Sequence, residues 1–227
     1  MIANPAEGTA APIDLVIYHG ACRDGFTAAW VARQRYPRAD FRAGYFGKGP
    51  PRVIGRHVLI ADFSYSRPVL DEMASQAESI LLLDHHKTAE AALGDLPYTR
   101  FDMDRSGAGI TWDYLFPEEP RPWIVNYVED RDLWRFALPG SKAVNAYLSV
   151  LTFAFDAWDG AQKLGLEKAR TLGEVVVAKI DQYVSEVRRN ARMITLDGYR
   201  VPAVNASPVD TSEVLEGLAI EIGRAHV

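Results

Sequence analysis

The sequence predicts an α/β fold with a doubly wound, mostly parallel sheet. Short, nearly uninterrupted apolar runs alternate with helix-like segments in the first half of the chain, as expected for strands buried on both faces. Three of these runs end directly in Asp or His: Ile13–Tyr18 before His19, Val58–Ala61 before Asp62, and Ile80–Leu83 before Asp84, His85 and His86. Ligands of open α/β sheets bind beyond the carboxyl ends of the strands. We therefore expect one site to which three strands contribute.

The elements follow in chain order, with turn residues between them. The expected strands are Ile13–Tyr18, Phe41–Phe46, His57–Ala61, Ser79–Leu83 and Tyr98–Asp102, and the expected helices between them are Asp24–Gln34, Pro68–Ala77 and Thr88–Leu93. Pro37 ends the first helix, and Pro68 lies in the first turn of the second. This alternation is the βαβ pattern of a parallel sheet.

After Ser106 the pattern becomes helical. The expected helices are Gly109–Phe116, Pro122–Asp130, Ser141–Val150, Asp159–Leu166 and the long amphipathic Leu172–Ile194. Asp197 and Gly198 form a hairpin signal between Met193–Leu196 and Tyr199–Asn205. We therefore expect a catalytic domain at 13–140, a helical region with a linker helix at 141–196, and the beginning of a second domain at 197–220.

Composition excludes several classes of protein. The chain has 227 residues, 48% of them hydrophobic, which is enough for a sizeable core. Its net charge of -5 argues against a non-specific polyanion binder, so stable binding of duplex DNA is not expected. The single cysteine, Cys22, excludes an intrachain disulfide and favours a reducing, cytoplasmic location. No apolar run approaches the ~20 residues of a membrane span.

The polar residues after the strands have the side chains that metal sites use. His19 and Asp24 flank the first strand-to-helix turn, and Asp62 follows a middle strand. A carboxylate in such a place can bridge two cations, although Asp24 could instead cap its helix and Asp62 could form an Asx turn. The Asp84-His85-His86 run is harder to explain by packing, because charged and imidazole groups are costly at the end of a buried strand.

Three further features are weaker on their own. Lys87 could contact a phosphate or be an ordinary exposed lysine. Ser106 and Gly107 begin a helix and could hold a phosphate through backbone amides, or form a simple N-cap. Asp130 or Asp132 could supply a late carboxylate ligand, and spacing does not decide between them.

Together these clusters resemble the DHH phosphoesterase family, whose name-giving motif is Asp84-His85-His86. The resemblance covers roughly Ile13 to Trp134 and is closest to the oligoribonuclease-like and cyclic-nucleotide phosphodiesterase-like branch, which includes exonucleases. It implies two divalent cations, with Mn²⁺ as the expected metal and Mg²⁺ as the alternative. The implied metal ligands are His19, Asp24, Asp62, His85 and Asp130, with Asp62 bridging both cations. His86 would contact the scissile phosphate or protonate the leaving oxygen, and Asp84 would orient its neighbours or bind a metal itself.

The resemblance also has departures. Many relatives carry a second aspartate two residues before the Asp-Gly pair, where this chain has Cys22, so Cys22 either binds metal or leaves one cation with fewer ligands. Relatives continue into a substrate-binding domain with a Gly-rich, His-containing motif that is missing here. We expect residues 1–12 to be a flexible leader and 221–227 a non-native tail, since Glu221–Val227 can be encoded by a sequencing-adapter-like string, so that the second domain is truncated.

The expected function is a metal-dependent phosphodiesterase acting on short oligonucleotides or nucleotide phosphodiesters. Alternatives are a phosphomonoester or pyrophosphate hydrolase on the same scaffold and a non-catalytic nucleotide-binding module, which the presence of Cys22 favours. The expected partner is the nucleotide substrate, and a homodimer is left open.

Overall fold

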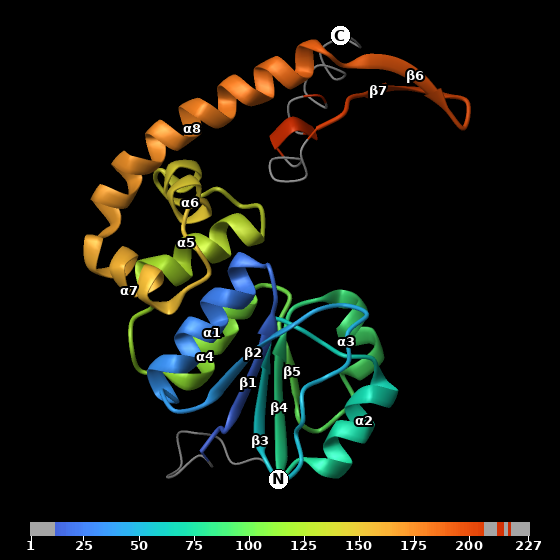
Figure 1. Ribbon diagram of the computed structural model, residues 1–227, viewed down its shortest axis with the longest axis vertical. Coiled ribbons are helices and arrows are strands. Elements are labelled where there is room, and N and C mark those ends of the chain that lie inside the picture. The colour runs from blue at the N-terminus through green and yellow to red at the C-terminus, as the bar shows by residue number, and fades with distance from the viewer. Residues whose placement is uncertain (1–11, 207–212, 216–217, 219–227) are drawn as a thin grey trace.

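The computed structural model describes residues 12–206, 213–215 and 218; the expectations for residues 1–11 and 221–227 lie outside this part of the chain. Its centre is a five-stranded sheet in the order β2-β1-β3-β4-β5 (Figure 1). The strands are β1 (Leu15–His19), β2 (Asp40–Gly44), β3 (His57–Ala61), β4 (Ser79–Asp84) and β5 (Thr99–Phe101). All four neighbouring pairs are parallel, which confirms the predicted fold class.

Alternation along the strands explains why both faces of the sheet are buried. Val16, Leu59 and Leu81 belong to the hydrophobic core on one face. Leu15 and Ile60, which are sequence neighbours of Val16 and Leu59, belong to the core on the other face. Successive side chains of a strand point to opposite faces, so an apolar run with no polar interruption requires cover on both sides.

Helices supply that cover. α1 (Arg23–Arg35) and α4 (Gly107–Leu115) lie on one face, and α2 (Arg67–Gln76) and α3 (Lys87–Leu93) lie on the other (Figure 1). From β1 the chain adds β2 on one side of the sheet, and it then adds β3, β4 and β5 on the other side, so the order reverses between β1 and β3. In open α/β sheets this reversal opens a crevice beyond the carboxyl ends of the two strands. His19 ends β1 and Asp62 follows β3, so both predicted ligands lie at this crevice.

The second half of the chain is mainly helical, as expected, but two helices differ from their expected bounds by four residues or more. Its helices are α5 (Trp123–Asp132), α6 (Ser141–Ser149), α7 (Phe155–Leu164) and α8 (Leu166–Arg189). The helix expected at 159–166 begins at Phe155, and the long helix begins and ends earlier than 172–194. The apolar Met193 and Ile194, which continued the helical pattern, belong instead to β6 (Arg192–Leu196).

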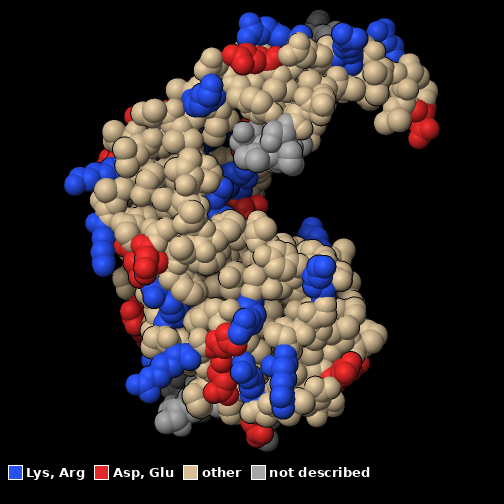
Figure 2. All heavy atoms as spheres, in the orientation of Figure 1, with Lys and Arg blue, Asp and Glu red and all other residues tan. Residues whose placement is uncertain are grey.

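The predicted hairpin is confirmed. β6 pairs antiparallel with β7 (Tyr199–Ala203), and the turn residues Asp197 and Gly198 have φ values of 49° and 82°. Two consecutive positive φ angles are typical of the primed turns that suit a two-residue hairpin. Together α8 and the hairpin form an arm (Figure 1), and the surface is hollowed between this arm and the part of the chain that holds the sheet (Figure 2). None of the described helices has the length and apolar character needed to cross a bilayer.

Candidate metal centre

Asp62 lies at the middle of the predicted site, in an unusual backbone conformation. Its φ is 57°, in the left-handed region that non-glycine residues rarely adopt, and its side chain is 1% exposed. Gly107 lies against it, because a Cβ at Gly107 would come within 2.7 Å of Asp62 Oδ1. Outliers of this kind persist where the surrounding structure over-determines them, which is common at functional sites.

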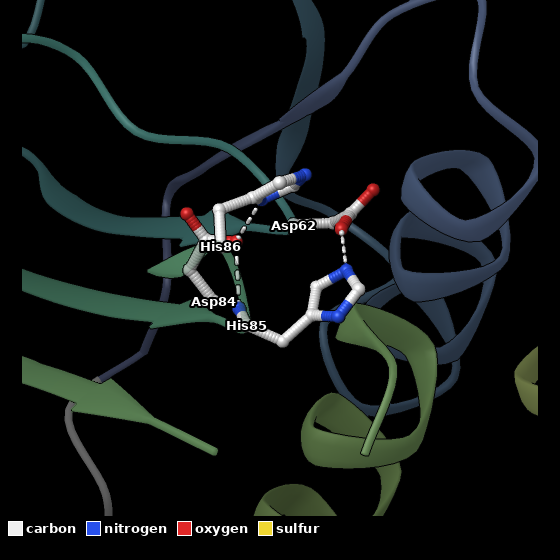
Figure 3. Close-up of side chains that lie close together, drawn as sticks. All are labelled: Asp62, Asp84, His85 and His86. Carbon is white, nitrogen blue, oxygen red and sulfur yellow. Dashed lines mark hydrogen bonds and ion pairs between the residues drawn. The ribbon is translucent and has the colours of Figure 1, made fainter. Parts of the chain in front are cut away.

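Imidazole and carboxylate groups from four separate parts of the chain converge on Asp62. His85 Nε2 is 3.2 Å from Asp62 Oδ1, 3.5 Å from Asp132 Oδ2 and 3.8 Å from Asp24 Oδ2 (the His85–Asp62 pair is drawn in Figure 3). His19 Nδ1 is 3.5 Å from Asp62 Oδ2. The structure therefore brings together His19, Asp24, Asp62 and His85, four of the five residues predicted as metal ligands.

This group fits divalent cations. Three buried atoms, both carboxylate oxygens of Asp62 and Nδ1 of His19, have no hydrogen-bond partner of acceptable geometry among the described residues. Burying such atoms without partners is costly. Three sets of donor atoms in the described residues lie close enough to share an ion. The first is His19, Cys22 and Asp62, the second is Asp24, His85 and Asp132, and the third is Asp62, Asp84, His85 and His86. Imidazole and carboxylate donors suit divalent cations, and the position of Asp62 between the first two sets suits a pair of them.

The carboxylates repel one another in the absence of a cation. Burial raises the pKa of Asp24 well above its ordinary value, and the nearby Asp62 and Asp132 raise it further. Burial also raises the pKa of Asp132. Burial opposes ionisation of Asp62 as well, but His19 and His85 hold its pKa at about 2. A bound cation would relieve the repulsion among these groups, because an opposite charge favours the ionised form.

Asp24 is fixed by the N-terminus of α4. The backbone N–H groups of Gly107 and Ala108 donate to its two carboxylate oxygens, at 2.6 and 3.0 Å. Ser106 Oγ accepts a hydrogen bond from the Gly109 N–H and so caps the helix. The first amides of α4 thus already bind carboxylates of the protein, and the phosphate contact predicted through Ser106 and Gly107 stays a prediction.

Asp84 binds its neighbours and orients His86. Its Oδ1 accepts from His86 Nδ1 at 2.6 Å and from the His85 N–H at 2.8 Å (Figure 3). Ser64, which the sequence did not single out, donates through Oγ to Asp84 Oδ2 at 2.6 Å. The hydrogen bond that His86 donates to Asp84 raises the pKa of His86 to about 9. Asp84 also lies close enough to Asp62, His85 and His86 to share an ion with them, so a direct metal contact stays open.

Two predicted residues lie at the edge of the site. Cys22 precedes α1 and groups with His19 and Asp62. Burial raises the pKa of its thiol, and the charges of Asp62 and Asp24 raise it further, so a thiolate there requires a bound cation. Lys87 is exposed at the first residue of α3, and its proposed phosphate contact stays a prediction.

The carboxylate that α5 contributes to the group around Asp62 belongs to Asp132. Asp130, the residue predicted for that position, accepts hydrogen bonds from the backbone N–H groups of Ala137 and Leu138, at 2.9 and 3.3 Å. The structure therefore does not bring Asp130 to the other ligands. Asp132 lies half a turn further along α5, on a different side of the helix, and this places its carboxylate beside His85.

Comparisons with known proteins agree with the fold and leave the family open. No family model matches the chain. An uncharacterised protein, R106, of Acanthamoeba polyphaga mimivirus is 29% identical over 205 residues, which covers 78% of this chain and 49% of R106. The chain thus spans about half the length of that curated relative.

Solved structures resemble the chain at low sequence identity. An uncharacterised protein from Helicobacter pylori G27 matches with a TM-score of 0.53 and 14% identity, over 82% of this chain and 74% of that one. A pGpG-specific phosphodiesterase from Vibrio, PggH, matches with a TM-score of 0.48 and 14% identity, over 88% of this chain and 74% of its own. The first of these similarities supports the α/β fold.

Proposed function

We propose that the protein is a metal-dependent phosphodiesterase of the DHH type, which hydrolyses short oligonucleotides or nucleotide phosphodiesters. The observation that carries the proposal is the convergence of His19, Asp24, His85 and Asp132 on the buried carboxylate of Asp62, which has ion-pair contacts to the two histidines but no hydrogen bond of acceptable geometry among the described residues. Such a set of donors is typical of sites that hold two divalent cations at a transferred phosphoryl group.

The ligand assignment is revised from the sequence-based one. Asp62 would bridge the two cations, His19 would bind one of them, and Asp24, His85 and Asp132 would bind the other. Cys22 is a further ligand candidate on the His19 side. Bound there, the cations would lower the pKa of a bound water and offset the negative charge of the phosphoryl oxygens.

The residues around the cations have separate tasks. In the metal-free chain the hydrogen bond to Asp84 raises the pKa of His86 to about 9, so Asp84 favours the protonated imidazole. A protonated His86 can donate a hydrogen bond or a proton to the leaving oxygen of the ester. The amides of α4 hold Asp24 in one orientation, which fixes a cation ligand before substrate arrives.

Hydrolysis of a panel of substrates tests the proposal. The chain is stripped of metal with EDTA, restored with Mn²⁺ or Mg²⁺, and assayed on linear dinucleotides, cyclic nucleotides, an aryl phosphodiester, an aryl phosphomonoester and pyrophosphate. We expect Mn²⁺-dependent cleavage of phosphodiesters. Asp62→Asn should lower the rate by about a hundredfold or more, because the central negative charge is lost.

Asp71→Asn is the matched control, because Asp71 is an exposed carboxylate on α2. It should keep the parent rate. Cleavage of monoesters or pyrophosphate alone would favour the alternative hydrolase, and nucleotide binding without any turnover would favour a non-catalytic module. Full Mn²⁺-dependent activity of Asp62→Asn would contradict the bridging role.

A further inference from the structure

A cavity of about 220 Å³ lies between the end of α5, α6 and α8. Arg23, Arg131, Trp134 and Phe136 form its polar and aromatic walls, and the side of α8 is mostly apolar. Arg23 immediately precedes Asp24, and Arg131 immediately precedes Asp132. The cavity is therefore next to the candidate metal centre, while none of the metal-ligand candidates lines it.

The two aromatic residues of this cavity are held in unfavourable backbone conformations. Trp134 has a φ of 55° and Phe136 a φ of 47°, and bulky residues are genuine outliers in the left-handed region. Asp130 fixes this loop: its backbone oxygen accepts from the Arg135 and Phe136 N–H groups, and its carboxylate accepts from the next two amides. Trp134 nevertheless stays 45% exposed. The loop thus holds a partly exposed aromatic surface at the cavity in a strained backbone conformation.

Two guanidinium groups face the same space. Arg131 is 4.8 Å from the Trp134 ring centroid and binds Glu213 at 2.9 Å. Arg23 is half-buried and lies within electrostatic reach of Arg131, Glu213 and Asp132. The described part of the chain gives its side chain no hydrogen bond and no ion pair at contact distance. Lys142 adds a third positive charge to the cavity, and Asp181 and Glu213 add two negative ones. Two neighbouring guanidinium groups, one of them without a hydrogen-bond acceptor among the described residues, are a suitable site for a phosphate.

We propose that this cavity binds one nucleotide unit of the substrate, beyond the phosphate that is cleaved. Its phosphate would lie on Arg23 and Arg131, and its base would stack on Trp134 or on the guanidinium plane of Arg131. This inference rests on the proposed function in one respect, namely that the bound nucleotide is part of a substrate. It implies a preference for linear substrates with a second phosphate over small cyclic ones.

Binding to the metal-free chain tests the cavity separately from catalysis. AMP, adenosine and inorganic phosphate are titrated into the full chain in EDTA by calorimetry, with the parent and with Arg23→Gln, Arg131→Gln and Trp134→Leu. We expect AMP to bind more tightly than adenosine or phosphate. Each arginine variant should weaken AMP binding by about tenfold to a hundredfold, which is the loss of one charged hydrogen-bonding partner. Trp134→Leu should weaken AMP but not phosphate.

Arg42→Gln is the matched control, since Arg42 is an exposed arginine of β2 paired with Asp40. It should bind AMP as the parent does. Arg131→Lys keeps the charge that pairs with Glu213 and should fold normally, yet bind AMP more weakly because it lacks the planar fork. Equal affinity for AMP in all variants would overturn the proposal, as would phosphate binding as tightly as AMP. Loss of Mn²⁺-dependent hydrolysis in the earlier assay, with AMP binding intact, would refute only the proposed function.

Discussion

At the scale of single residues, the environment of Asp62 depends on a glycine. A methyl group at position 107 would collide with the Asp62 side chain, since both Cβ and Oδ1 of Asp62 lie within contact distance of the added carbon. Gly107→Ala should therefore displace Asp62 and lower the phosphodiesterase rate by about a hundredfold, as misplacements of about 1 Å do. The rate and the Mn²⁺ affinity are the measurements.

Gly160→Ala provides the control for this substitution. Gly160 lies on the exposed side of α7, and an added Cβ there meets nothing within 4 Å. Alanine should raise helix stability there by up to about 1 kcal/mol and leave activity unchanged. If Gly107→Ala bound Mn²⁺ and turned over as well as Gly160→Ala, the close approach of Gly107 to Asp62 would have no functional role.

The Asp84–His86 pair predicts a pH effect. In the metal-free chain His86 should titrate near 9, and in Asp84→Asn its pKa should fall toward the ordinary value of ~6.5. Because the folded-state pKa is raised, the charged pair contributes stability below about pH 6.5 and loses it as pH rises through about 9. Histidine ring NMR over pH 5 to 10 measures the shift; an unchanged His86 pKa in Asp84→Asn would contradict the assigned hydrogen bond.

At the scale of elements, the last turn of α5 separates two aspartates with different tasks. Asp132→Asn should weaken Mn²⁺ binding by at least about tenfold, since it removes a carboxylate beside His85. Asp130→Asn should instead lower the free energy of unfolding by about 1–3 kcal/mol, because it weakens two charged hydrogen bonds to the backbone. Calorimetric Mn²⁺ titration and urea unfolding of both variants check this division, and the reverse pattern would contradict it.

The sequence predicted strands better than it predicted helix ends and contacts between elements. β3 was predicted with its observed bounds, because an uninterrupted apolar run flanked by polar residues has few other interpretations. The end of α8 was predicted too late, since the apolar residues of β6 continue its amphipathic pattern. The choice between Asp130 and Asp132 needs the orientation of α5 against β4, and the capture of α4 amides by Asp24 needs a contact between residues 83 positions apart. The spacing of residues along the chain gives neither the orientation of α5 nor the contact between Asp24 and α4.

At the scale of the whole molecule, the sheet supplies the candidate centre and the helical half supplies the neighbouring cavity. The ligand candidates come from the ends of β1, β3 and β4, from α1 and from α5, while α6 and α8 complete the cavity beside them. The arm of α8 and the hairpin overhangs a hollow in the surface (Figure 2). Several residues of the hairpin expose large apolar side chains, among them Leu196 and Tyr199.

The central claim is that side chains distant in the sequence bind divalent cations together at one edge of the sheet. Anomalous diffraction at the manganese absorption edge, from crystals of the chain grown with Mn²⁺, tests it most directly. We expect two anomalous peaks flanking Asp62, one within ligand distance of His19 and the other within ligand distance of His85, Asp24 and Asp132. Well-ordered crystals with no peak beside Asp62, or with manganese bound only elsewhere, would contradict the claim.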